Sequence, residues 1–143
     1  MKVIRSIAAV IAGFVAASVG MMVVETANGR LFYPELGKSA EGVTDREEIR
    51  ALMAGAPVGA LAVVLIGWVL GSVVGGFLAT LIGRKPPGRH ALALGILLTL
   101  AGIANNLMLP PPLWFWIATF VVFLPAAYVG ARLVPQQVPG SNG

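Results

Sequence analysis

The stretch "VLIGWVLGSVVGGFLATLIGRKP", Val64 to Pro86, decides the fold of this chain. It carries no charge before Arg84, and the apolar run reaches back to Val58. That length covers the roughly 20 helical residues needed to cross a bilayer core about 30 Å thick. Small residues recur at every fourth position, namely Gly67, Gly71, Gly75, Ala79 and Gly83. Because four residues advance a helix by slightly more than one turn, these positions form a slanting stripe without large side chains, a glycine-zipper pattern.

Composition extends the membrane interpretation to the whole chain. Of its 143 residues, 57% are hydrophobic and 11% are charged, whereas about a quarter of a soluble domain is charged. The expected spans are residues 7–27, 58–83, 90–109 and 113–134. Strands are a poor alternative because the runs are too long, lack period-two alternation, and an open sheet edge cannot be satisfied in lipid. The sequence therefore predicts an all-α integral membrane four-helix bundle, a single transmembrane domain over residues 1–143.

The first apolar run also has features of a signal peptide, since Lys2 and Arg5 precede it and "AASVG" offers small residues for cleavage. The run from Ile7 to Val24 is longer than the apolar core of a usual signal peptide, about 7–15 residues. We expect it to be a retained anchor.

Charge asymmetry predicts the orientation. With four spans, both termini lie on the same side as the loop between the second and third spans. The basic residues of that side, which lacks acidic residues, are Lys2, Arg5, Arg84, Lys85, Arg89 and Arg132. The positive-inside rule then places both termini in the cytoplasm and the chain in the cell inner (plasma) membrane.

The net charge of +4 follows from these loop residues, so it does not indicate nucleic-acid binding. Membrane lipids are the expected partners, through contacts between anionic head groups and the cytoplasmic cations. The residues expected to make these contacts are Arg84, Lys85, Arg89 and Arg132.

The polar segment 28–57 is expected to be a periplasmic or extracellular loop with one short helix at about residues 44–54. Thr44 is a candidate N-cap, and Glu47 three residues later completes a capping box. Gly55 and Pro57 end the pattern. Its first half, "GRLFYPELGKSAEG", reads as an interfacial anchor followed by turn residues.

Helices associate in lipid through close packing at small residues, so the stripe of the second span should be a packing groove. The first span offers Ala9, Gly13 and Ala17. The third offers Ala91, Gly95, Thr99 and Gly102. Both stripes are expected to pack against the second span and close a four-helix core. A homodimer seam is the alternative use of these grooves.

Three polar residues in or near the spans could carry chemistry: Glu25, Asn105 and Asn106. Under the predicted topology they lie at similar depth near the outer end of the bundle, and an intramembrane ionisable residue indicates function by default. Together they could bind a cation, relay a proton or recognise a polar head group. The structural alternative is that Glu25 bonds to Arg30 or to water, while the asparagines bond to each other or to backbone.

Enzyme chemistry is not expected. The chain has no cysteine and one histidine, which excludes thiolate metal sites and disulfides. We find no nucleophile–base pair, no metal-ligand cluster and no phosphate-binding loop, so no catalytic residue, metal or cofactor is predicted. His90 is expected to start the third span at the interface, not to ligate haem or pigment.

The segments "PVGALAVVLIGWVLGSVVGGFLATLIGR" and "AGIANNLMLPPPLWFWIATFVVFLPAAYVGARL" resemble small four-helix bacterial inner-membrane proteins with no assigned function. The resemblance implies the fold and the membrane, but no active residues. Small multidrug transporters also have four spans and a glutamate in the first. Here Glu25 lies at the outer end of its span and a long loop follows, so we set that family aside.

These features favour the first of two functions, and the second is the alternative. The first is a non-catalytic accessory, scaffold or complex subunit that acts through helix packing, as a homodimer or within a larger membrane complex. The second is a small transporter or channel for an ion or small polar solute, with its site at Glu25, Asn105 and Asn106.

Overall fold

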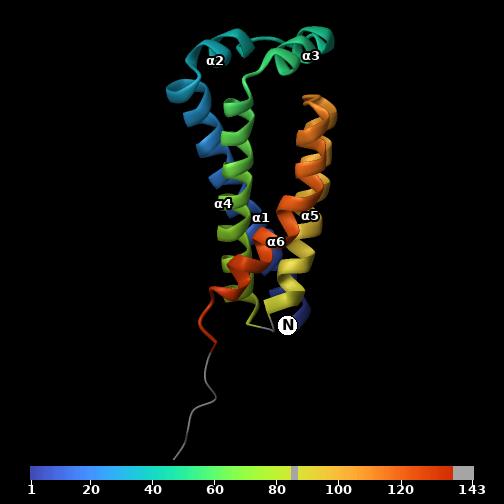
Figure 1. Ribbon diagram of the computed structural model, residues 1–143. Coiled ribbons are helices and arrows are strands. Elements are labelled where there is room, and N and C mark those ends of the chain that lie inside the picture. The colour runs from blue at the N-terminus through green and yellow to red at the C-terminus, as the bar shows by residue number, and fades with distance from the viewer. Residues whose placement is uncertain (85–86, 137–143) are drawn as a thin grey trace, which may run out of the picture.

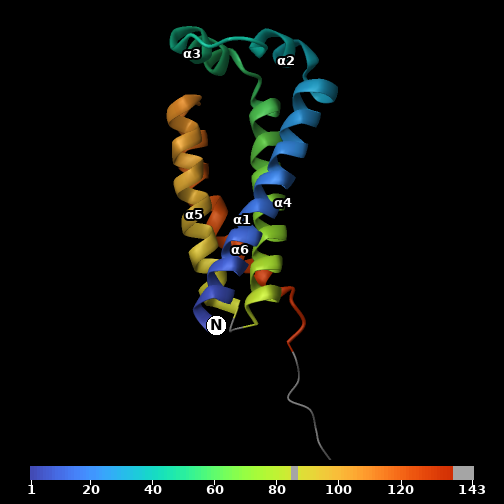
Figure 2. The ribbon, with the colours of Figure 1, turned by 180° about the vertical axis from the view of Figure 1, so that it is seen from behind.

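The computed structural model describes residues 1–84 and 87–136, in which every regular element is helical. Four long helices run along the molecule: α1 (Lys2–Ala27), α4 (Val58–Gly83), α5 (Pro87–Met108) and α6 (Leu113–Arg132). A π-helical segment, η1 (Asn28–Phe32), continues α1 and leads to the short helices α2 (Pro34–Ala40) and α3 (Arg46–Gly55). Figures 1 and 2 show α2 and α3 lying across one end of the long helices, which we call the capped end.

The long helices have the character of membrane spans. All four are long and apolar enough to cross a membrane. Large apolar side chains remain exposed along their outer faces, for example Ile7, Ile11 and Val15 on α1 and Ile117 and Val121 on α6. Surfaces of this kind are unfavourable in water but suit hydrocarbon. The chain is therefore a membrane protein.

The stripe on α4 allows α1 to approach very closely. A Cβ atom at Gly71 would lie 2.7 Å from the carbonyl oxygen of Ala17, and one at Gly75 would lie 2.6 Å from that of Gly13. Real Cβ atoms essentially never come closer than 3.0 Å to such a neighbour, so a side chain at either position would force the helices apart. The upper part of the stripe continues this contact, because Gly67 lies against Val24.

The opposite face of α4 packs as tightly against α6. A Cβ at Gly76 would overlap the carbonyl oxygen of Ala127, and one at Gly130 would overlap that of Val73. Because α4 meets backbone on both sides, it is the central helix of the bundle.

The expectation that the third-span stripe packs against the second span is wrong for its glycines. On α5, Gly95 lies against Leu124 and Gly102 against Phe123 and Thr119, all on α6. The physical reason is that α1 and α6 already occupy both small-residue faces of α4. The glycines of α5 instead accommodate bulky side chains of α6.

Two short helices, not one, follow α1. Pro34 starts α2, a favourable first helical position for proline. Gly37 looks like a turn residue in the sequence, but a Cβ there would overlap the carbonyl oxygen of Gly29 in η1. The N-cap of α3 is Asp45 and not Thr44, since the Asp45 carboxylate accepts hydrogen bonds at 3.1 Å from the amides of Glu47 and Glu48.

The end of the bundle opposite α2 and α3 is closed by contacts around Gly83. His90 is buried and its ring lies where a Cβ of Gly83 would be. The third span begins before it, at Pro87, and His90 in the first turn is enclosed by protein. Arg5 Nη2 donates to the Gly83 carbonyl at 3.2 Å, satisfying one of the acceptors left free at a helix end. Of the cations predicted to contact head groups, Arg84, Arg89 and Arg132 are exposed near this end. Lys85 lies outside the described residues.

Candidate ligand-binding cavity

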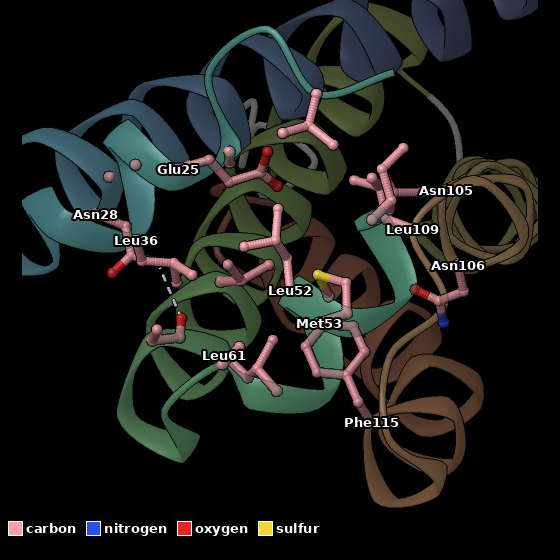
Figure 3. Close-up of a pocket in the computed structure, with 18 residues that line it drawn as sticks. Glu25, Asn28, Leu36, Leu52, Met53, Leu61, Asn105, Asn106, Leu109 and Phe115 are labelled. Carbon is pink, nitrogen blue, oxygen red and sulfur yellow. Dashed lines mark hydrogen bonds between the residues drawn. The ribbon is translucent and has the colours of Figure 1, made fainter. Parts of the chain in front are cut away.

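A cavity of about 340 Å³ lies at the capped end, between α1 and α4 on one side and α5 and α6 on the other, beneath α2 and α3. Its lining includes Glu25, Asn105 and Asn106. Figure 3 shows side chains from α1, α3, α4 and α5 converging on this space, which we call the Glu25 cavity. The structure thus brings all three predicted site residues to one place; their role as a functional site stays a prediction.

Glu25 projects from the last turns of α1 and is held by an aromatic donor. Its Oε1 accepts a hydrogen bond of 3.0 Å from Nε1 of Trp68, on α4. The carboxylate therefore bonds to an indole across the helix interface, which was not among the partners expected for it. This bond also fixes the position of the carboxylate beside the cavity (Figure 3).

Trp68 is a site residue that the sequence reasoning missed. It is 3% exposed, stacks on Phe123 at 5.1 Å and meets the edge of Phe115 at 5.2 Å. A buried indole N–H needs an acceptor. A tryptophan inside an apolar span, with Glu25 the nearest acid on the preceding span, was the signal that could have revealed the pair.

Asn106 is fully buried at the wall formed by α5. Its Nδ2 donates to Thr119 Oγ1 at 2.8 Å, and the Thr119 hydroxyl in turn donates to the Phe115 carbonyl at 2.8 Å. A hydroxyl has one hydrogen to give. Because Thr119 gives it to Phe115, it must accept from Asn106, which fixes which end of the amide faces Thr119.

The other end of that amide, Asn106 Oδ1, is therefore directed toward the cavity (Figure 3). It is buried and has no hydrogen-bond partner among the described residues. Such an atom costs free energy, of the order of 1–3 kcal/mol, unless something satisfies it. The neighbouring Asn105 also lines the cavity but is exposed, so the two asparagines do not play equivalent parts.

Asn28 provides a second acceptor of the same kind. It lies at the start of η1 and is 6% exposed, and its Nδ2 donates to the Ala60 carbonyl at 2.9 Å. Its Oδ1 is buried without a partner in the described part of the chain. The cavity lining thus contains a carboxylate and two asparagines, each of which donates one amide N–H to the protein and has a buried oxygen without a partner among the described residues.

The rest of the lining is largely apolar, with Leu52, Met53, Leu61 and Phe115 among its residues, and includes no lysine or arginine within the described ranges. Those ranges also hold no group of three or more His, Asp or Glu side chains placed to bind a metal ion. The site is therefore an apolar space with polar groups at its edge.

Comparisons with protein-family models, curated proteins and solved structures found no match to this chain.

Proposed function

We propose that this membrane protein binds a small solute in the Glu25 cavity and acts as a small transporter or as the solute-binding subunit of one. The observation that carries the proposal is the meeting of Glu25, Asn105 and Asn106 in a single cavity. Its volume of about 340 Å³ falls within the range of small-molecule sites, about 300–1,000 Å³. An apolar lining with a few convergent polar groups is typical of such sites.

The proposal includes an orientation. We infer that the capped end faces the outside of the inner membrane and that both termini are cytoplasmic, because Arg84, Arg89 and Arg132 lie toward the other end of the spans and Lys85 follows Arg84 in the sequence. The cavity then opens toward the periplasm or cell exterior, where it can take solute from outside. The same cations are proposed to contact anionic lipid head groups.

A non-catalytic accessory subunit is the second proposal. It was motivated by the small-residue stripes, which offer a seam for another chain. Gly71, Gly75 and Gly76 lie against the chain's own α1 and α6. They are therefore unavailable to a partner unless the helices separate, and we rank this function second.

The absence of cysteine from the chain makes single-cysteine labelling a direct test. Val64→Cys places a thiol at the cavity wall, whereas Ile66→Cys places one on the outer face of the same helix, at a residue that is 56% exposed. In right-side-out vesicles, a membrane-impermeant maleimide should label the cysteine at position 64 and not the lipid-covered one at 66. Failure to label position 64, or equal labelling of both, would refute an open, hydrated cavity facing outward.

A functional comparison uses the same two positions. Val64→Trp fills the cavity, whereas Ile66→Trp adds the same ring to the outer face. In a strain deleted for the gene, we expect the Ile66 variant to restore every phenotype of the deletion and the Val64 variant to fail. Full complementation by a stably expressed Val64→Trp protein would contradict the proposed function.

A further inference from the structure

We propose that the ligand of the Glu25 cavity is an organic cation, a protonated amine carried on a compact hydrocarbon body. This inference rests on the proposed function and adds the chemical class of the solute.

The buried polar atoms of the lining that have no partner among the described residues are both acceptors. One N–H of Asn106, one N–H of Asn28 and the indole N–H of Trp68 are each bound by a protein acceptor, namely Thr119, the Ala60 carbonyl and Glu25. What faces the space is the Glu25 carboxylate together with the Asn106 oxygen, and the latter lacks a partner in the described chain (Figure 3). A ligand that satisfies them must bring donors, and an ammonium group brings three.

The negative charge of Glu25 favours a positively charged ligand. Glu25 supplies a negative charge at the cavity, and no lysine or arginine lies among the described lining residues to offset it. A carboxylate or phosphate ligand would meet like charge, whereas a cation forms a charge-assisted hydrogen bond, roughly twice as strong as a neutral one.

The apolar walls favour an organic cation over a bare metal ion as the ligand. Calcium requires about six to eight oxygen ligands around it, whereas much of this lining consists of residues such as Leu36, Leu52 and Val64. Figure 3 places Glu25 and Asn106 on opposite sides of the space, with Met53 and Leu61 beside it. A hydrocarbon body would cover these side chains while its ammonium group meets an acceptor.

Trp68 makes the test local, because its N–H bonds directly to Glu25. In a parent protein that carries Trp114→Phe and Trp116→Phe, Trp68 is the one tryptophan left in the sequence. The protein, in nanodiscs of zwitterionic phosphatidylcholine, is titrated with phenethylamine, phenethyl alcohol and phenylpropionate while indole emission is recorded. These probes share a ring and differ in the charge of the end group.

We expect a saturable change in emission with phenethylamine, at least about tenfold weaker binding of the alcohol, and no binding of phenylpropionate. Glu25→Gln keeps an acceptor for Trp68 but removes the charge, and should weaken amine binding about tenfold or more. Glu47→Gln is the matched control, since it changes the same charge on α3 outside the cavity lining. It should bind the amine as the parent protein does.

Asn106→Leu, which keeps the volume and removes the acceptor, is the second variant and should also weaken amine binding if Glu25→Gln does not fold. Equal binding of the amine and the alcohol, or no binding of any probe, would overturn the assignment to organic cations. Unchanged amine affinity in every folded cavity variant would overturn it as well. These results would not contradict the proposed solute-binding function as long as Val64→Cys is labelled from outside. Loss of that labelling would contradict it.

Discussion

Replacing Gly75 with alanine tests whether the close approach of α1 and α4 stabilises the molecule. The new Cβ would lie 2.6 Å from the Gly13 carbonyl oxygen, 2.9 Å from Ala17 Cβ and 3.2 Å from Leu94 Cδ2. Ordinary contacts begin at 3.4 Å. The Gly13 carbonyl must therefore retreat by about 0.8 Å, and because it is backbone, the whole of α1 has to shift.

The size of the effect is the balance of two terms. Overpacking of a tight interface costs about 1–3 kcal/mol, and the better helix propensity of alanine offsets up to about 1 kcal/mol of this. A net loss of about 1–2 kcal/mol remains. At roughly 3 °C per kcal/mol for a chain of this size, the Tm of Gly75→Ala should fall by about 3–6 °C.

The assay is thermal unfolding of the protein in mild detergent, followed by intrinsic fluorescence. Gly20→Ala is the matched control, because it lies on α1 in the same interface and its Cβ would stand 3.6 Å from Gly71 Cα, an ordinary contact. That variant should unfold at the parent temperature or slightly above it. If Gly75→Ala and Gly20→Ala unfold at the same temperature, the packing argument is refuted.

Three further substitutions test single contacts. Trp68→Phe preserves the ring cluster but removes the N–H that donates to Glu25 at 3.0 Å. We expect the free energy of unfolding to fall by about 1–2 kcal/mol, seen as a lower Tm. An unchanged Tm would mean that this hydrogen bond does not stabilise the protein. Asp45→Ala removes the N-cap of α3, which should cost about 1 kcal/mol and speed amide hydrogen exchange in α3 but not in α4; equal protection of α3 in both proteins would contradict this. In the parent protein the amide of Asn106 donates to Thr119 at 2.8 Å, and Thr119→Val leaves this N–H buried without an acceptor. The free energy of unfolding should fall by about 1–3 kcal/mol. Parent-like stability would show that the amide finds another acceptor.

The helices themselves were largely predictable because their signals are local. The second span was expected at residues 58–83, and α4 covers Val58–Gly83. The apolar run between Pro57 and Arg84 is uninterrupted, so the ends of the helix coincide with the ends of the run. The capping region was less predictable. Thr44 and Asp45 are both good N-cap residues and stand side by side, so a local pattern cannot choose between them. Glycine is common in turns, so the local sequence favours a turn at Gly37. The structure instead needs glycine there because the backbone of Gly29, in another element, lies against it.

The sequence grouped three residues of the candidate site but missed Trp68 and Asn28, and it did not predict the bonds. Depth along the spans was enough to group Glu25, Asn105 and Asn106. Rotation about each helix axis decides which side chain enters the bundle, and it depends on the neighbouring helices. Adjacent residues on a helix point about 100° apart, so Asn106 is buried against Thr119 while Asn105 is exposed.

By itself, the amino-acid sequence determined that this chain forms long apolar helices and that one of them carries a stripe of small residues, because hydropathy and spacing are properties of a single segment. Only the tertiary structure decided that α4 is central, that α5 packs its glycines against α6, and that Trp68 holds Glu25. These outcomes depend on which faces meet. A face full of small residues specifies close approach but not the identity of the partner, and that choice is made by all the helices packing together.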